Sequence, residues 1–182
     1  EKFFLNDLVE VPPQQISHIA KDHAAQWLQS KLGFQPQVSN STSGRPIIDE
    51  PSFDISISHK PPWIFCGYAK RPHRIGLDVE NLKENISGEN FEDYIVNNFE
   101  LELVKKSSNT YDKNQLMIIV FSIKESICKS LDVAFSPLRL HMTEFQFSSS
   151  KRGSATTEVG EKVVQSSFTI EDDHVWSSTV HC

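Results

Sequence analysis

Three strand-like segments follow one another between residues 53 and 80, separated only by short turns. The stretch FDISISHKPPWIFCGYAKRPHRIGLDVE carries prolines and charged residues at HKPP and KRPH, where the chain is expected to turn. Strands joined this closely pair with their neighbours in the antiparallel direction. The sequence therefore predicts antiparallel strands in this part of the chain.

The segment after Asp112 has the clearest helical pattern. Asp112 and Gln115 have the spacing of a capping box, in which each side chain accepts a hydrogen bond from the other residue's backbone N–H. An apolar stripe follows, and Pro137 prevents the helix from continuing further. The stripe consists of Leu116, Val120, Ile123, Ile127 and Leu131. This pattern predicts a helix that buries one face.

Residues 12–32 and 90–105 also have helical patterns. The first segment begins with two prolines, which suit the first turn of a helix, and ends before Gly33. Its apolar stripe is expected to contain Ile16, Ile19, His23, Trp27 and Leu28. In the second segment the apolar residues are spaced four apart, namely Phe91, Ile95 and Phe99. Both segments are predicted to be helices.

The chain after residue 137 is predicted to form mainly strands. The segments LRLHM, EFQF, VVQSSFTI and HVWSSTV have strand-like composition. Residues 37–46 and 148–162 are polar and are expected to form loops. The order helix, strands, helix, helix, strands is typical of the α+β class. We therefore expect one α+β domain with antiparallel strands over residues 1–182.

The composition is that of an ordinary soluble globular protein, with 38% apolar and 23% charged residues. A net charge of −6 argues against broad binding to nucleic acids or anionic membranes. No apolar run is long enough to cross a bilayer, and the three scattered cysteines are expected to be reduced thiols of a cytoplasmic protein. The chain begins with Glu1 and has no signal-peptide pattern, so we expect that some N-terminal sequence is missing.

Two carboxylates lie side by side in the stretch RIGLDVENL. In an extended chain Asp78 and Glu80 point to the same face, opposite the apolar residues. Their mutual repulsion must be offset by a bound cation or by exposure to water, and on these two residues alone exposure is the more common outcome. Glu125 could supply a third carboxylate for a metal, although with Lys129 four residues later it could equally form a solvated ion pair.

Four residues have side chains that could bind an anion. His59 lies where a strand meets a turn, between Ser58 and Lys60, and Arg45 lies in the loop before that strand. At such positions each of these residue types is more often simply solvated. There is no Walker loop and no GxGxxG motif, so any phosphate would be held by side chains and metal.

Four motifs, in this order, resemble those of a known enzyme family. They are GRP at 44–46, SISHK at 56–60, IGLDVE at 75–80 and FSIKESICK at 121–129. In these motifs the chain is similar to the 4′-phosphopantetheinyl transferases of the surfactin-type class, and in particular to the enterobactin synthase component D group. The resemblance covers residues 44–131, and FTIEDDHVWSSTV loosely matches the family's closing strands.

The resemblance implies a fold and a reaction. The fold would be two similar α+β halves with pseudo-twofold symmetry, here residues 1–100 and 101–182, with the active site at their junction and an active monomer. The enzyme would move the 4′-phosphopantetheine group of coenzyme A to a serine of an apo acyl, peptidyl or aryl carrier protein and release 3′,5′-ADP. Siderophore, polyketide, fatty-acid and lipid pathways are all open as the source of that carrier protein.

The resemblance also implies roles for individual residues. Asp78, Glu80 and Glu125 would hold a Mg²⁺ that also binds the coenzyme A pyrophosphate. Glu125, directly or through a metal-bound water, would take the proton from the carrier serine. Lys129 would stabilise the departing ADP, with Lys124 a weaker candidate for that contact.

Further basic and polar residues would bind the rest of the substrates. The resemblance places three residues on the coenzyme A phosphates, namely Arg45, Ser58 and His59. Lys21 and Lys31 are candidates for binding the 3′-phosphate. An acidic carrier protein could be attracted by a small basic cluster of Lys105, Lys106 and Lys113.

Two other functions are compatible with the same residues. A carrier-binding relative without activity would be marked by a changed ligand set, whereas all three carboxylates and Lys129 are present here. An unrelated Mg²⁺-dependent phosphohydrolase would hydrolyse coenzyme A or nucleotides without any carrier protein.

Overall fold

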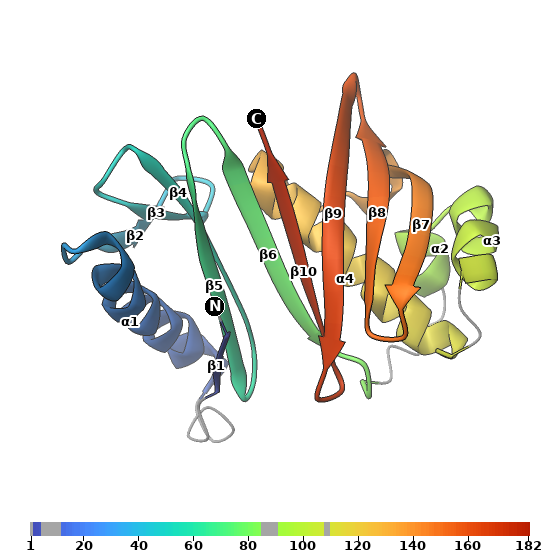
Figure 1. The fold of residues 1–182 in the computed structure, drawn as a ribbon, viewed down its shortest axis with the longest axis horizontal. Helices are drawn as coiled ribbons and strands as arrows, with labels where there is room; N and C mark the ends of the chain where they lie inside the picture. Colours follow the sequence, from blue (N-terminus) through green and yellow to red (C-terminus); the bar gives the residue numbers. More distant parts are fainter. Residues whose placement is uncertain (1, 5–11, 85–90, 108–109) are drawn as a thin grey trace.

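The computed structural model describes residues 2–4, 12–84, 91–107 and 110–182 (Figure 1). It is a mixed α+β structure in which every strand pairing is antiparallel. The predicted fold class is therefore confirmed.

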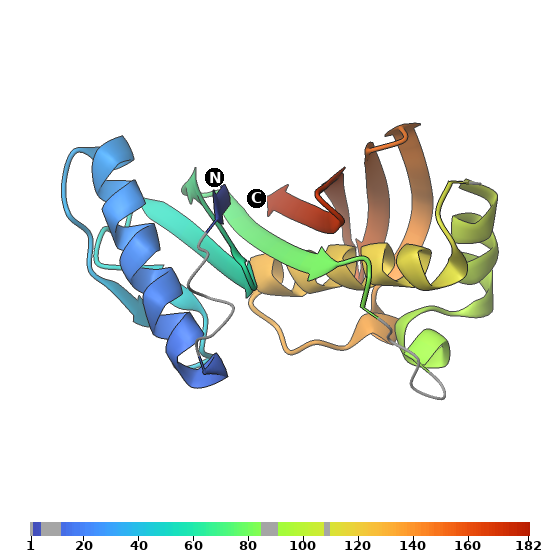
Figure 2. The ribbon, with the colours of Figure 1, turned by 90° about the horizontal axis from the view of Figure 1, so that it is seen from below.

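A small sheet and a long helix form the N-terminal part of the molecule. The sheet has the order β1–β5–β4, and the two-stranded hairpin β2–β3 lies beside it. Helix α1 packs against β4 (Figure 2). The bounds are β1 Lys2–Phe4, α1 Pro13–Leu32, β2 Val38–Asn40, β3 Pro46–Ile48, β4 Phe53–Lys60 and β5 Trp63–Lys70. Strand β2 and the first residue of β3 lie within the stretch 37–46, so the loop between these strands is confined to residues 41–45 and the prediction was wrong for the strand residues.

Helix α1 ends where the sequence predicts. Gly33 adopts the left-handed conformation, with φ of 79°, and its backbone N–H donates to the Gln29 carbonyl. The buried stripe is narrower than predicted, because the half-buried Ile19, His23 and Trp27 flank it. Its four fully buried members are spaced four apart, namely Ile16, Ala20, Ala24 and Leu28. The two alanines let the helix lie close to the sheet.

A five-stranded sheet forms the larger part of the molecule, in the order β6–β10–β9–β8–β7. Although β6 follows β5 in the sequence, it pairs along its whole length with the last strand, β10. Helix α4 crosses one face of this sheet (Figure 2). The bounds are β6 Arg74–Asn81, α4 Lys113–Leu131, β7 His141–Ser149, β8 Arg152–Val159, β9 Lys162–Glu171 and β10 His174–His181.

Helix α4 is the centre of the main hydrophobic core. Its predicted capping box is confirmed, with the Asp112 side chain accepting from the Gln115 N–H and the Gln115 side chain accepting from the Asp112 N–H. The predicted stripe packs into the main core, and Met117, Ile118 and Ile119 are buried as well. Cys128 is also buried. The helix is therefore covered on more than the one face that the pattern indicates.

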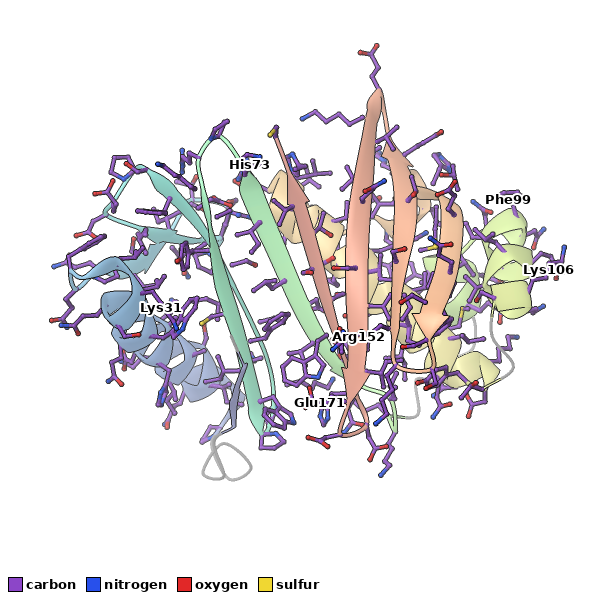
Figure 3. All side chains as sticks on the ribbon, viewed as in Figure 1. Lys31, His73, Phe99, Lys106, Arg152 and Glu171 are labelled. Carbon is purple, nitrogen blue, oxygen red and sulfur yellow. The ribbon has the colours of Figure 1, made fainter. Side chains whose placement is uncertain are left out.

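The segment predicted as one helix over 90–105 is two helices, α2 Phe91–Ile95 and α3 Asn98–Ser107. Asn97 interrupts them, because it exchanges reciprocal hydrogen bonds with Glu100 and so starts a new helix. Phe99 consequently points outward on α3 and is 64% exposed (Figure 3). Residue 90 lies outside the described residues.

The polar segment 148–162 contains a strand, β8, so the prediction of a loop over it was wrong. Gly153, Ala155 and Thr157 alternate as buried residues along β8, and their small side chains hide the apolar signal. A Cβ atom at Gly153 would lie 2.3 Å from the Phe168 ring. Gly153 is therefore needed for packing, although the polar composition of the segment suggests a flexible loop.

Gly76 allows helix α4 to lie directly on strand β6. A Cβ atom at this position would lie 1.9 Å from the carbonyl oxygen of Ser126. Serines at four-residue spacing line the facing side of the helix, namely Ser122, Ser126 and Ser130. The close approach brings Asp78, two residues beyond Gly76, next to the side chains of α4.

No helix in the described part of the chain is both long and apolar enough to span a membrane.

Candidate active site

A cavity of about 300 Å³ lies between α1, the β2–β3 hairpin, β4 and the second half of α4. Its walls bring together Arg45, His59, Glu125 and Lys129, which come from three separate sequence motifs. Lys21 of α1 also lines it. The predicted site residues around this cavity are therefore neighbours in space.

The hairpin is tied to the end of α4 and so closes one side of the cavity. Ser43 Oγ donates to Asp132 Oδ1 at 2.7 Å, and Arg74 Nη2 lies 3.5 Å from Asp132 Oδ2. Asp132 is the left-handed residue that terminates α4, with φ of 57°. The Ser43 contact holds the loop that carries Arg45 against the end of α4, and the Arg74 contact joins the same aspartate to β6.

Asp78 is the most deeply buried carboxylate of the site, with 2% of its surface exposed. Its Oδ1 atom accepts from Lys129 Nζ at 2.5 Å and from Ser58 Oγ at 2.9 Å. Lys129 Nζ also lies 3.2 Å from Ser58 Oγ. The second oxygen, Oδ2, is buried and has no hydrogen-bond partner. A buried carboxylate oxygen without a partner is costly, and a ligand that supplies positive charge would remove that cost.

Glu125 stands on α4 beside this cluster, and its carboxylate lies 3.9 Å from Lys129 Nζ. Burial raises the pKa of Glu125, and the charge of Asp78 raises it further, while Lys129 acts in the opposite direction. The pair is therefore partly buried in the cavity wall, unlike the solvated ion pair that the spacing alone allows.

Glu80 is held by Lys60, whose Nζ lies 2.8 Å from the Glu80 carboxylate and 2.6 Å from that of Glu84. Burial and the charge of Asp78 raise the pKa of Glu80 to about 7, despite the opposing effect of Lys60. Asp78 and Glu80 therefore repel each other at a position that water reaches poorly. Exposure to water does not account for the two carboxylates lying side by side.

The pKa values of Lys129 and His59 are shifted as well. Burial tends to lower the pKa of Lys129, but the charges of Asp78, Glu125 and Glu80 outweigh it and raise this pKa. Burial lowers the pKa of His59, and the nearby Lys129 lowers it further. Lys129 is therefore charged and His59 is neutral at pH 7.

The carboxylates of Asp78, Glu80 and Glu125 are of the ligand type that hard cations such as Mg²⁺ prefer. In the part of the chain that the structure describes, no three His, Cys, Asp or Glu side chains lie close enough together to form a metal site. Lys129 and Lys60 are instead paired with Asp78 and Glu80. Even so, the unpartnered Asp78 Oδ2 and the raised pKa of Glu80 are features expected of carboxylates that bind a cation.

Arg45 lines the cavity, but its guanidinium is buried and already paired. Its Nη2 atom donates to Asp54 Oδ2 at 2.5 Å, to the Ile75 carbonyl at 2.9 Å and to the Ile55 carbonyl at 3.3 Å. The charge of Arg45 is thus largely matched within the protein.

Lys124 does not reach the cavity. Its fully buried Nζ atom donates to both carboxylate oxygens of Glu100, at 3.0 and 2.9 Å, and to the carbonyls of Ile95 and Pro137. Contact with coenzyme A would require breaking this buried ion pair. The sequence could not reveal this, because Glu100 is 24 residues away.

The suggested basic cluster is partly neutralised by its surroundings. Lys105 lies 3.4 Å from Glu102, and Lys113 is paired with Glu92. Lys106 points outward from α3 (Figure 3). Lys31 is not among the residues that line the cavity.

Sequence reasoning missed Asp54 and Ser56, which lie on β4 ahead of Ser58. Their side chains accept hydrogen bonds from the backbone of β6. The available signal is the alternation of polar residues in DISISHK, which indicates a polar face on a strand that proves to be buried.

One comparison with known proteins identifies a family for this chain. A profile of the 4′-phosphopantetheinyl transferase superfamily matches residues 74–181, which begins at the first residue of β6 and covers more than half of the chain. A search of curated proteins gave no match. The matched region contains Asp78, Glu80, Glu125 and Lys129, and its mixed α+β fold is consistent with that family. The chain belongs to the 4′-phosphopantetheinyl transferase superfamily and is a transferase of that type.

Proposed function

We propose that this protein transfers the 4′-phosphopantetheine group of coenzyme A to a serine of an apo acyl, peptidyl or aryl carrier protein, releases 3′,5′-ADP and depends on Mg²⁺. The observation that carries the proposal is the cluster of Asp78, Glu125 and Lys129 beside the cavity, with one buried carboxylate oxygen left without a partner. The four motifs favour the surfactin-type class, and within it the enterobactin synthase component D group.

Asp78, Glu80 and Glu125 are the residues that would hold Mg²⁺. The ion would supply positive charge to the phosphoryl oxygens of the transition state and offset the repulsion between the carboxylates. Asp78 Oδ2 is available for this role without loss of any hydrogen bond. Lys60 and Lys129 form ion pairs with Glu80 and Asp78 and so also balance their charge.

The transfer itself needs a base and a cation from the chain. The carrier serine Oγ forms a bond to the phosphorus attached to pantetheine, and the bond from that phosphorus to the bridging oxygen of 3′,5′-ADP breaks. Glu125, whose raised pKa suits a base, accepts the serine proton. Lys129 moves from Asp78 to the pyrophosphate and stabilises the charge that develops on the departing ADP.

The cavity would hold the phosphate-bearing part of coenzyme A. His59 of β4 and Lys21 of α1 both line it, and Ser58 Oγ accepts a hydrogen bond from Lys129 Nζ at 3.2 Å. His59 would bind a phosphate oxygen through a neutral ring N–H, because its pKa is lowered. Arg45 shapes this wall, but its Nη2 atom is committed to Asp54.

The carrier protein would approach along an apolar patch that continues from the cavity wall. Val133 and Phe135 line the cavity beside Glu125. The Tyr94 ring on α2 packs on Phe135, and Leu138 follows in the short helix η2 (Pro137–Arg139), which contacts α2. Tyr94, Val133 and Leu138 are each about half exposed, at 51%, 52% and 48%. Exposed apolar side chains that adjoin the reacting groups are suited to docking a protein whose serine must enter the cavity.

Three broader expectations belong to the same proposal. The protein would act in the cytoplasm, and it would act as a monomer, because residues of one chain suffice to form the cavity. The halves 1–100 and 101–182 repeat one fold, although main-chain pairing joins β6 to the strands of the second half.

The test is the intact mass of an apo peptidyl or aryl carrier protein after incubation with this protein, coenzyme A and Mg²⁺, with EDTA in a parallel sample. We expect the mass to rise by one phosphopantetheinyl group, and EDTA to prevent the rise. Coenzyme A consumed with the carrier unchanged would favour a phosphohydrolase. An unchanged carrier together with intact coenzyme A, across several carrier types, would favour a carrier-binding protein without activity.

A further inference from the structure

Strand β4 contacts strand β6 through side chains instead of through main-chain pairing. The Asp54 carboxylate accepts from the Ile75 N–H at 2.9 Å. Two residues further along both strands, Ser56 Oγ accepts from the Leu77 N–H, also at 2.9 Å. Both contacts are buried. They satisfy backbone donors on the edge of β6 that faces away from β10.

The same face of β4 continues to the two carboxylates of the site. Ser58 Oγ donates to Asp78 Oδ1 at 2.9 Å, and Lys60 Nζ lies 2.8 Å from Glu80. The alternate residues of β4 thus make four successive contacts with β6. We call this set the seam, and it consists of Asp54, Ser56, Ser58 and Lys60.

Arg45 fixes the first contact of the seam. Its Nη2 atom donates to Asp54, to the Ile55 carbonyl of β4 and to the Ile75 carbonyl of β6. The guanidinium therefore bridges the two strands at the end remote from Asp78. A buried charge pair that also binds both main chains strongly opposes sliding of one strand along the other.

The position of β6 along β4 decides where its carboxylates lie. A shift by one residue would turn Asp78 and Glu80 to the opposite face of the strand. Helix α4 packs on β6 at Gly76, and β10 pairs with β6 along its whole length, so these contacts fix β6 within the larger sheet. The position of β6 relative to β4 depends on the contacts of the seam.

We propose that Asp54 and Ser56, supported by Arg45, are positioning residues of the transferase: through the seam they set the register of β6 and so place Asp78 and Glu80 for cation binding. Asp54 is not among the residues that line the cavity, and Ser56 does line it, with its Oγ accepting from the Leu77 N–H. The inference rests on the proposed function for its catalytic consequence, but the register itself can be tested separately.

The experiment compares Ser56→Ala with Ser166→Ala. Both serines are buried to the same degree, and Ser166 donates or accepts only within the second sheet, at 2.7 Å from Thr179. Ser56→Thr, which keeps the hydroxyl, is the conservative variant. For each protein we would measure amide hydrogen exchange at Leu77, Mg²⁺ affinity by titration of backbone amide signals, and the kcat and KM of transfer.

We expect Ser56→Ala to lose protection at Leu77, to weaken Mg²⁺ binding roughly tenfold and to lower kcat by a similar factor, with the KM for coenzyme A unchanged. Ser56→Thr should restore these values, and Ser166→Ala should change only stability. The inference is overturned if Ser56→Ala and Ser166→Ala have the same Mg²⁺ affinity and the same kcat.

Asp54→Asn provides a second variant in case Ser56→Ala does not fold. It keeps an oxygen for the Ile75 N–H but loses the charge that holds Arg45, so Mg²⁺ binding should again weaken. Binding of Mg²⁺ without any transfer in the unaltered protein would refute the proposed function and leave the register inference standing. Wild-type Mg²⁺ affinity in Asp54→Asn would refute the register inference alone.

Discussion

Lys124 and Glu100 form a fully buried ion pair, with both carboxylate oxygens of Glu100 within 3.0 Å of Lys124 Nζ. Lys124 also binds carbonyls of Ile95 and Pro137, and Glu100 accepts from the Met142 N–H at 2.7 Å. The pair therefore joins α2, α3, η2 and β7 around α4, and supports the surface that carries Tyr94 and Leu138.

Lys124→Met is expected to destabilise the protein by about 3–5 kcal/mol, because it leaves the Glu100 carboxylate buried without its partner. Urea unfolding followed by circular dichroism measures this change. The double variant Lys124→Met/Glu100→Gln should recover part of the loss. If Lys124→Met were as stable as the unaltered protein but bound coenzyme A more weakly, Lys124 would be a substrate contact after all.

Asp78→Asn and Glu125→Gln should each reduce transfer by about 100-fold or more, because each removes a charge that acts on the phosphoryl group or on the serine proton. The mass assay on an apo carrier protein measures the effect. Glu158→Gln, an exposed carboxylate on β8, is the matched control and should be fully active. Near-normal activity of either site variant would remove that residue from the site.

Addition of Mg²⁺ should raise the midpoint of thermal unfolding, because a ligand that binds only the folded state stabilises it. The gain is about 2.7 kcal/mol when the Mg²⁺ concentration is about 100 times its Kd. EDTA should reverse the shift, and Asp78→Asn should abolish it. An equal Mg²⁺ response in Asp78→Asn would mean that the ion binds elsewhere.

Gly76→Ala should destabilise the protein by about 3 kcal/mol or more and abolish transfer, because the new methyl group meets the backbone of α4 at Ser126. Gly67→Ala is the control, since its Cβ would lie 3.0 Å from the Leu77 side chain, which can move. Thermal unfolding and the mass assay together measure both effects. Equal losses in the two variants would show that α4 adjusts easily to β6.

Tyr94→Ser and Leu138→Ser should raise the KM for the carrier protein roughly tenfold and leave the KM for coenzyme A unchanged. Both side chains are exposed beside the cavity, so their removal should cost little stability. Val163→Ser is the control, because Val163 is 65% exposed on β9, outside the patch. An unchanged carrier KM in both patch variants would place the docking surface elsewhere.

The sequence predicts those parts of the fold whose signals are local. The capping box of Asp112, the stop at Gly33 and the turns around β5 depend on neighbouring residues, and each is found where the pattern indicates. The break at Asn97 was also locally encoded, by its spacing to Glu100, but the apolar residues on either side of it suggested a continuous helix.

Contacts between distant segments account for what the sequence could not predict. The buried partner of Lys124 and the side-chain acceptors for the β6 backbone lie about 20 or more residues away in the chain. Likewise β8 was missed because its buried positions are the small residues Gly153, Ala155 and Thr157, which give no strong apolar signal. The contact of Gly153 with the Phe168 ring is visible only in the structure. For the site, the sequence motifs predicted the carboxylates as candidate metal ligands. The structural role of Arg45 could be recognised only from its buried contacts.

The pairing of β6 has a consequence for how the molecule unfolds. This strand shares its main-chain hydrogen bonds with β10 and receives the buried side chains of β4. Separation from β10 would break that pairing, and separation from β4 would break the hydrogen bonds of the Ile75 and Leu77 N–H groups. The N-terminal sheet and the larger sheet are thereby thermodynamically linked. The chain should unfold in one cooperative transition. If the chain is cleaved between β5 and β6, neither of the two resulting fragments should be stable on its own.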